Sequence, residues 1–383
     1  MIQSKLPNTA VRIFSSLGSL IEETGAVDMA SSKTDFPCAP ELIRIAEGHL
    51  KSEFNNYAPV EGALKLREAI AGRVKAGYGH LYHPQTEVTV TAGSVQAIHT
   101  AISAVVKDDD EVIVFEPAYE SFVPSIILNG GKPVYVQLKL PDFKVDWEDL
   151  RRMVTSKTRM IIINSPHNPT GSVFSENDML QLQRLTNGTN IIVLSAEIYE
   201  SIVFDNTIHQ SVARFEKLAD RSFIVSSFGP LYHVNGWGLA YCLGPEKLMT
   251  EYRKVQYFQV YNANTPFQHA LADYLPVSNP MEDISELYQG KRNYFNRLMG
   301  KSLFQVIPAQ GGYFQLLDYS GLSDEPDVIF AERLIREYGV ATLPVSAFFH
   351  EKNKHRYLRI CFAKTNETLE QAAARLLKVP SML

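Results

Sequence analysis

The sequence is poor in cysteine and carries little net charge. Its 383 residues include only three cysteines, Cys38, Cys242 and Cys361. They are too few and too far apart for a disulfide framework or for the paired spacing of a zinc site. The 37 basic and 42 acidic residues leave a net charge of −5, which is too small to indicate a nucleic-acid partner. The composition therefore excludes a disulfide-rich secreted domain and a strongly basic nucleic-acid-binding protein.

Long hydrophobic runs are also absent. The first residues lack the basic stretch and apolar run of a secretory signal, and no later stretch approaches the roughly 20 apolar residues of a membrane span. The scarcity of cysteine favours a reducing compartment, so we expect a cytoplasmic protein with no membrane partner and no bound metal. With 45% hydrophobic and 10% aromatic residues, the chain can build a large core.

The sequence instead contains short apolar runs, and each run ends in a turn that contains glycine, proline or asparagine. Runs buried on both faces and separated by helical patterns are typical of a mostly parallel sheet covered by helices. The spacing of Val95, Ile98, Ile102 and Val105 predicts one such helix face. The fold class is therefore α/β. The predicted strands are Val112–Phe115, Met160–Ile163, Ile191–Leu194, Phe223–Val225 and Leu239–Leu243.

The pattern changes near residue 282, where a charged helix precedes strand-like pieces and a last helix that begins near Asn366. We predict a large domain over 46–281 and a small α+β domain over 282–383. Residues 1–45 carry their own apolar helix pattern, and we expect them to pack with the small domain.

Several predicted strands are followed by loops that can bind a ligand. Gly93 and Ser94 come between a strand and a helix, where free backbone N–H groups favour phosphate. Ser94 reads equally well as an ordinary helix cap, and Tyr119, at the end of the next strand, as a core aromatic. Asn168-Pro169 forms part of a dense turn cluster, and further loops follow the strands before Tyr199 and Trp237. Ligands of open α/β sheets bind at such strand ends, so we expect one site there, with phosphate as its anchor.

In this order the motifs resemble the type I fold of pyridoxal-phosphate (PLP) enzymes, and most closely the methionine and kynurenine aminotransferase group. The resemblance covers nearly the whole chain. It is carried by Asn56–Pro59, Thr91–Gly93, Glu116–Tyr119, Asn168–Pro169, Glu197–Tyr199, Ser227–Gly229, Gly236–Trp237, Asn264–Pro266 and Leu358–Lys364.

The resemblance implies PLP as cofactor, an amino acid and a 2-oxo acid as substrates, and a homodimer. Gly93, Ser94 and Ser227 would hold the phosphate, together with Tyr57 from the neighbouring subunit. Tyr119 would stack on the pyridine ring, and Asn168 and Tyr199 would bind its phenolic oxygen. Arg359 would bind the substrate carboxylate, a role that suits the planar guanidinium.

Three positions depart from the family's pattern. Pro230 stands where the family has the lysine that holds the cofactor and moves the Cα proton, and proline can do neither. Ala196 replaces the aspartate that pairs with the ring nitrogen. The adjacent Glu197 is a poor substitute, because successive strand residues point to opposite faces. Gly238 replaces an arginine or lysine that contacts the phosphate.

These losses leave several functions open. The chain can be an aminotransferase-like protein impaired in ordinary transamination, with PLP bound weakly or without a covalent bond. It can be an enzyme that uses His233 as its base, or one in which Lys33 replaces the lost lysine. It can also be a non-catalytic subunit that pairs with an active relative. An intact aminotransferase acting on methionine or aromatic amino acids is the default that family membership implies.

Overall fold

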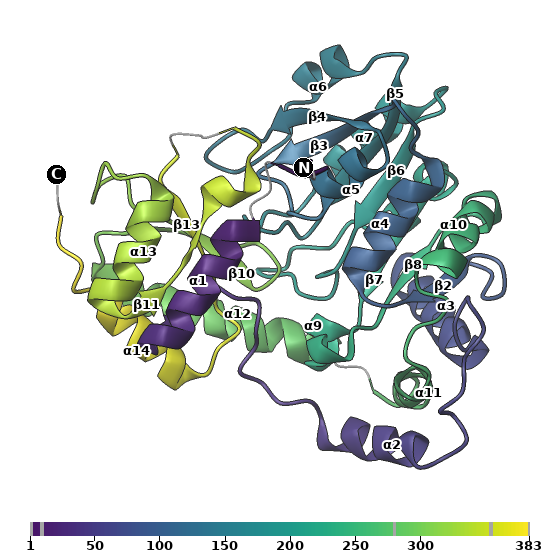
Figure 1. The fold of residues 1–383 in the computed structure, drawn as a ribbon, viewed down its shortest axis with the longest axis horizontal. Helices are drawn as coiled ribbons and strands as arrows, with labels where there is room; N and C mark the ends of the chain where they lie inside the picture. The colour runs from purple at the N-terminus through teal and green to yellow at the C-terminus, as the bar shows by residue number, and fades with distance from the viewer. Residues whose placement is uncertain (1–2, 8–10, 279–280, 352–354, 382–383) are drawn as a thin grey trace.

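A computed structural model of the chain describes residues 3–7, 11–278, 281–351 and 355–381. It has two halves, each built on its own sheet (Figure 1). The helices are α1 Val11–Thr24, α2 Pro40–Leu50, α3 Leu64–Tyr78, α4 Ser94–Val105, α5 Phe122–Leu128, α6 Trp147–Met153, α7 Glu176–Thr186, α8 Glu216–Ala219, α9 Gly229–Tyr232, α10 Glu246–Gln259, α11 Thr265–Tyr274, α12 Met281–Leu298, α13 Asp327–Tyr338 and α14 Asn366–Leu376.

The larger half is organised around a seven-stranded sheet in the order β2-β8-β7-β6-β5-β3-β4. Only β8 runs antiparallel to its neighbours; the pairs from β7 to β4 are all parallel. The prediction of a mostly parallel α/β sheet is thus confirmed, and each predicted strand lies in it. The strands are β2 Val88–Thr91, β3 Glu111–Glu116, β4 Lys132–Gln137, β5 Thr158–Asn164, β6 Ile192–Ala196, β7 Ser222–Ser227 and β8 Ala240–Leu243.

The continuous apolar runs follow from burial of both sheet faces. Val112 and Val114 of β3 pack in one hydrophobic cluster with α4, whereas Ile113 and Phe115 pack in the cluster on the other face. A strand between two helical layers has no polar side. In α4 the expected apolar face is buried at Ile98, Ile102 and Val105, but Val95 in the first turn is 51% exposed.

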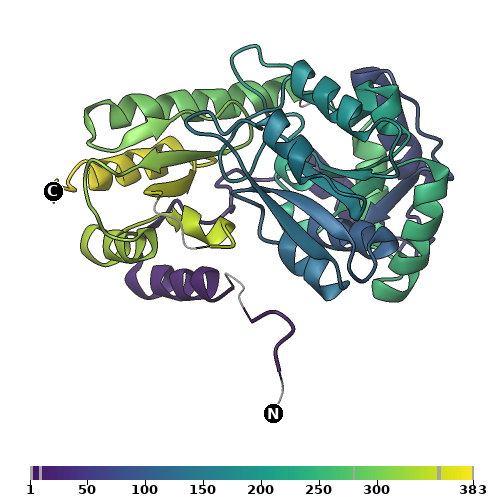
Figure 2. The ribbon, with the colours of Figure 1, turned by 90° about the horizontal axis from the view of Figure 1, so that it is seen from above.

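The smaller half contains the antiparallel sheet β12-β13-β10-β9. Its strands are β9 Gln305–Ile307, β10 Phe314–Asp318, β12 Leu343–Pro344 and β13 Tyr357–Cys361. The N-terminal part of the chain joins this half: β1 (Val27–Asp28) pairs in parallel with β11 (Val340–Ala341), and α1 contacts α13. Figures 1 and 2 show α1 beside these C-terminal elements.

Helix α2 lies apart from α1, against α11 of the larger half (Figure 1). The expected boundary at residue 45 therefore falls within α2, whereas α12 begins at Met281, beside the expected boundary at 282.

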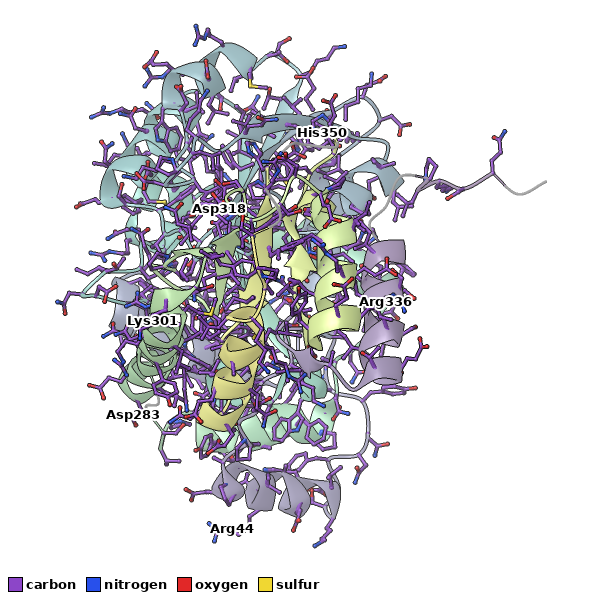
Figure 3. The ribbon with its side chains drawn as sticks, turned by 90° about the vertical axis from the view of Figure 1, so that its left-hand side faces the viewer. Arg44, Asp283, Lys301, Asp318, Arg336 and His350 are labelled. Carbon is purple, nitrogen blue, oxygen red and sulfur yellow. The ribbon has the colours of Figure 1, made fainter. Side chains whose placement is uncertain are left out.

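Charged side chains such as Arg44, Asp283, Lys301 and Arg336 are exposed on the outside of both halves (Figure 3). No helix in the described ranges is long and apolar enough to cross a membrane.

Candidate functional site

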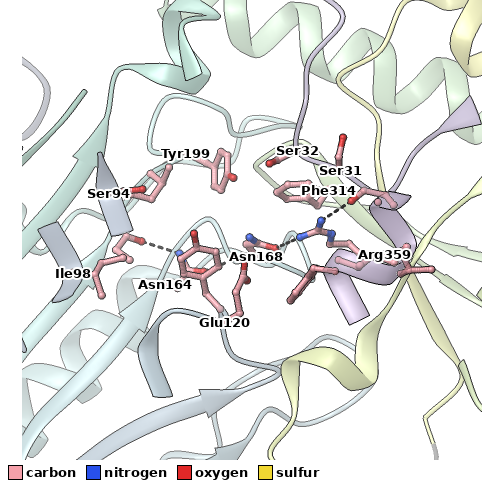
Figure 4. A pocket seen from close by; sticks show the side chains of 18 of the residues that line it. Ser31, Ser32, Ser94, Ile98, Glu120, Asn164, Asn168, Tyr199, Phe314 and Arg359 are labelled. Carbon is pink, nitrogen blue, oxygen red and sulfur yellow. Dashed lines mark hydrogen bonds between the residues drawn. The ribbon is translucent and has the colours of Figure 1, made fainter. Parts of the chain in front are cut away.

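A pocket lies where the C-terminal ends of β3, β5 and β6 meet α1 and the smaller sheet (Figure 4). Its volume is about 980 Å³, including its open mouth. Of the residues expected at a site, Ser94, Tyr119, Asn168, Tyr199 and Arg359 all line it. The other lining residues are Phe14, Leu17, Gly18, Ile21, Ala30, Ser31, Ser32, Ile98, Glu120, Asn164, Ala196, Ile198, Phe314 and Leu343.

The N-terminus of α4 forms one end of the pocket. Gly93 precedes the helix with φ +86°, in the region that favours glycine, and no side chain caps the helix. The ordinary cap role for Ser94 is therefore wrong, because Ser94 is already the first helical residue and its side chain lines the pocket. The first N–H groups of a helix attract anions.

Two asparagines connect the strand ends at the floor of the pocket. The Asn164 side chain accepts a hydrogen bond from the backbone N–H of Asn168 at 3.0 Å and donates one to the carbonyl of Ala196, also at 3.0 Å. These bonds tie the loop after β5 to the end of β6. They hold Asn168 in place, so that its Oδ1 can accept a hydrogen bond from Arg359 at 2.9 Å.

Arg359 is held rigidly at the opposite end. Its Nη1 donates to Asn168 Oδ1, and its Nη2 donates to the carbonyl of Ala30 at 2.7 Å (Figure 4). The guanidinium stacks 4.0 Å from the ring centre of Phe314. Arg359 is only 6% exposed, and among the described residues its Nε–H has no partner. Burial lowers the pKa of the guanidinium, while Glu120 opposes this shift. The guanidinium remains a cation that lines this end of the pocket, where it can attract a carboxylate.

The two tyrosines form the walls between these ends. Tyr199 is 8% exposed, its ring contacts Tyr313 edge-on at 4.9 Å, and burial raises the pKa of its hydroxyl well above the usual value. Burial also raises the pKa of the half-buried Tyr119. Both hydroxyls therefore stay protonated and can donate hydrogen bonds.

Other expected site residues lie outside the pocket lining. Ser227 contacts the backbone of Leu239 and Gly229, and it shares a small separate cavity with Pro230. Tyr57 is 81% exposed and packs against Tyr261 on the surface. His233, at φ +55°, turns its Nδ1 to the carbonyl of Pro37 at 3.3 Å, and its ring contacts Phe36 and Tyr288.

The side of the pocket at β6 carries no acid. Ala196 lines the pocket, whereas the neighbouring Glu197 carboxylate points away from it. Glu197 accepts hydrogen bonds from Ser195 Oγ at 2.7 Å and the Val212 N–H at 3.1 Å, and it pairs with His209 Nε2 at 3.0 Å. Ala196 and Glu197 thus point to opposite faces of the strand, as their alternation in the sequence predicted, and Glu197 cannot take the place of an aspartate at position 196.

A second buried acid, Glu200, lines the same small cavity as Ser227 and Pro230. It pairs with Arg73 at 3.2 Å and accepts hydrogen bonds from Tyr78, Ser226 and Tyr241 at 2.7–3.0 Å. Arg73 is the nearby cation that lowers the pKa of Glu200 against the opposing effect of burial. Its carboxylate is fully used within the protein, although Glu197, Glu200 and His209 lie close together.

Sequence reasoning missed Glu120 and Asn164. Glu120 directly follows Tyr119, and Asn164 directly follows the predicted strand Met160–Ile163, so position at a strand end was an available signal for both. It could not tell which of several adjacent polar residues faces the pocket.

The fold and the pocket define an aminotransferase-type α/β protein. The family profile of aminotransferase class I and II matches residues 24–376, and the chain belongs to this family. The methionine aminotransferase of Escherichia coli is 38% identical over 375 residues, which cover 98% of this chain and 97% of that protein.

Solved structures agree with this assignment. The structure of YbdL from Escherichia coli, described with a methionine aminotransferase function, superposes with a TM-score of 0.95 at 37% identity and covers 99% of both chains. The N-succinyldiaminopimelate aminotransferase of Mycobacterium tuberculosis superposes with a TM-score of 0.96 at 31% identity, over 99% of this chain and 100% of that one.

Proposed function

We propose that this chain keeps the aminotransferase fold and a pocket for an amino acid or 2-oxo acid, but does not catalyse ordinary PLP-dependent transamination. The observation that carries this proposal is Pro230. It lies just beyond β7, buried beside Ser227 and Tyr199, where the family resemblance implies a lysine. No amine is available there to hold the cofactor or to move a proton.

The lining residues fit PLP only in part. Ser94 and the N-terminus of α4 suit a phosphate, Tyr119 suits a flat ring, and Asn168 and Tyr199 suit an oxygen on that ring. Bound PLP would supply an electron sink. No amine lines the pocket in the described part of the chain, and no acid lies at Ala196. The residues present therefore do not fit a covalently held, electronically tuned cofactor.

The hydrogen bond that is lost at Ala196 corresponds to a known range of free energy. A hydrogen bond to a charged group is worth about 1.5–3 kcal/mol. Glu197 cannot restore it, because its carboxylate is occupied by Ser195, His209 and Val212 on the other side of the strand. Gly238 likewise offers no side chain to a phosphate near Ser94. Weak PLP binding follows from these two positions, and the absence of a covalent bond follows from Pro230.

The remaining groups of the pocket support ligand binding. Arg359 offers a rigid cation to a carboxylate, and apolar residues of α1 such as Phe14 and Leu17 cover the opposite wall. The observed place of His233, against Pro37 and outside the lining, does not favour it as a replacement base. Lys33 is exposed and outside the lining as well. Ordinary catalysis by an intact enzyme remains the competing proposal, supported by the 38% identity to a methionine aminotransferase.

The visible absorption spectrum of the purified chain with added PLP tests this proposal. We expect no absorption band from PLP bound covalently to the protein, and borohydride should leave no cofactor permanently attached. We also expect no turnover of methionine with a 2-oxo acid above the rate of PLP in buffer. A lysine-containing aminotransferase treated in the same way is the positive control. A borohydride-fixed cofactor or steady turnover by the chain would overturn the proposal.

We also propose that the chain pairs through the surface around Tyr57. Phe258 is 87% and Tyr257 49% exposed, and their rings pack with Tyr57 and Tyr261 in one exposed aromatic group. An exposed aromatic group of this kind is typical of an interaction surface. A second copy, or an active relative in a heterodimer, would cover it.

We expect Phe258→Asp to shift the chain from dimer to monomer in sedimentation velocity, because burying a charge at an apolar interface is costly. Ile329→Asp, which alters an exposed apolar residue of α13, serves as the matched control and should leave the dimer intact. A wild-type chain that sediments as a monomer at all concentrations would contradict the homodimer.

A further inference from the structure

Lys364 is unusual because its side chain is buried. It lies in the connection between β13 and α14, on the same segment as Arg359, and its side chain is only 3% exposed. Among the described residues it is the only lysine that is buried. Lysine carries a strongly hydrated charge and is rarely buried without partners. The partners of this ammonium group therefore indicate its role.

The ammonium group of Lys364 contacts the segment 28–35, which forms part of one wall of the pocket. Its Nζ donates a hydrogen bond to the carbonyl of Lys33 at 2.8 Å and lies 3.5 Å from Oδ1 of Asp35. The other carboxylate oxygen of Asp35 accepts a hydrogen bond from the N–H of Thr365 at 3.1 Å, just before α14. One buried cation thus joins the pocket wall to the end of the strand that carries Arg359.

The same segment holds Arg359 in place. The carbonyl of Ala30 accepts the hydrogen bond from Nη2 of Arg359. Asp28 fixes this turn, because its Oδ1 accepts hydrogen bonds from the N–H groups of Ala30 at 3.0 Å and Ser31 at 2.9 Å. Ser31 and Ser32 line the pocket on the same side as Arg359 (Figure 4). Movement of this segment would therefore change both the pocket wall and the direction of Arg359.

Backbone hydrogen bonds fix the two ends of the segment. The carbonyl of Met29 accepts a hydrogen bond from the N–H of Cys361 at 2.7 Å, and the N–H of Asp35 donates one to the carbonyl of Ala363 at 3.1 Å. Within the described ranges, no backbone–backbone hydrogen bond holds residues 30–34. The middle of the segment thus depends on side chains, and Lys364 supplies one of these contacts.

We propose that Lys364 is a positioning residue for the pocket. Its ammonium group holds the segment 28–35, so that the carbonyl of Ala30 keeps the guanidinium of Arg359 directed at a ligand carboxylate. This inference rests on the proposed function only in taking Arg359 as the carboxylate-binding group. Loss of the ammonium group removes both the hydrogen bond to Lys33 and the ion pair with Asp35, so the segment can move away from Arg359.

Isothermal titration calorimetry of the full chain with 3-phenylpropanoate tests this role. The compound has a carboxylate for Arg359 but no amino group, so it cannot undergo transamination. At a temperature where both proteins are folded, we expect Lys364→Met to bind it about ten-fold more weakly than the wild type. Asp35→Asn removes the ion pair but keeps the hydrogen bond to Lys33, and should weaken binding about three-fold. Lys301→Met, which changes an exposed lysine of the same half (Figure 3), is the matched control and should bind like the wild type.

Hydrogen–deuterium exchange adds a measurement that needs no ligand. The backbone amides of residues 30–34 should exchange faster in Lys364→Met, whereas those in the first turn of α4, at the other end of the pocket, should not change. Faster exchange throughout the pocket would contradict a local role.

Three results would overturn the inference. The first is no binding of 3-phenylpropanoate by the wild type. The second is an affinity of folded Lys364→Met within about two-fold of the wild type, which with a lowered melting temperature would show a role in stability alone. If Lys364→Met does not fold, unchanged affinity of Asp35→Asn is the third. A borohydride-fixed cofactor would instead overturn the proposed function and leave the comparison of these affinities intact, so the two failures are distinguishable.

Discussion

Restoring the three missing side chains is expected to convert the chain into a working aminotransferase. The triple variant Pro230→Lys, Ala196→Asp, Gly238→Arg should show a visible PLP band that borohydride fixes, and it should turn over methionine with a 2-oxo acid. Positioned acid–base groups contribute about 10²–10⁴-fold to a rate, so we expect at least a 100-fold gain over the parent chain.

The local structure can accept these changes. Pro230 lies in the first turn of α9, where an added N–H needs no helical partner, and it lies beside Tyr199, whose side chain also lines the main pocket. Nothing lies within 4 Å of a Cβ at Gly238, although its φ of +61° costs a side chain about 1–2 kcal/mol. Ala196 already lines the pocket.

The control is the variant Pro230→Ala in the same Asp and Arg background, which has every restored group except the amine. It should bind PLP without a borohydride-fixed band. If this control turned over substrate as fast as the triple variant, the amine at position 230 would not be the missing element. A folded triple variant without a fixed cofactor would show that this backbone does not direct residue 230 at the pocket.

Arg359→Lys is expected to reduce the binding of 3-phenylpropanoate and of L-phenylalanine by about 100-fold. Each hydrogen bond between charged groups is worth about 1.5–3 kcal/mol, and 1.4 kcal/mol corresponds to ten-fold in affinity. Lysine keeps the charge but lacks the planar fork that binds Asn168 and Ala30 at the same time.

Calorimetry measures the affinity, and thermal unfolding of the same variant measures the second consequence. The Asn168 side chain and the Ala30 carbonyl lose donors, so stability should fall by about 1–3 kcal/mol. Arg336→Lys, on the exposed face of α13, is the control and should change neither quantity. An affinity within three-fold of wild type would mean that the carboxylate does not bind at Arg359.

Much of the fold could be predicted from local patterns. The runs Val112–Phe115 and Met160–Ile163 are apolar at every position because each strand is covered on both faces, and such runs need no knowledge of distant residues. The expectation for Val95 failed because apolar spacing alone does not show which turns of a helix the rest of the fold covers, and Val95 lies in the first turn, where it is exposed.

The candidate site could be predicted only at positions next to a strand end. Asn168 and Tyr199 follow predicted strands, and the structure places both in the pocket. The contacts that make Arg359 rigid come from Ala30 and Phe314, which lie far away in the sequence. Periodicity carries no information about such long-range contacts. For the same reason, the sequence did not show that Glu120 and Arg359 line the same pocket.

The sequence by itself determined which groups the chain lacks: no amine at Pro230, no carboxylate at Ala196 and no cation at Gly238, because covalent structure sets side-chain chemistry. Only the tertiary structure decided whether a neighbour takes their place. Glu197 turns to His209, His233 turns to Pro37, and Lys33 is exposed, since the direction of a side chain depends on the backbone and on the packing around it. The same packing brings Arg359 and Glu120 to one pocket from separate halves of the chain.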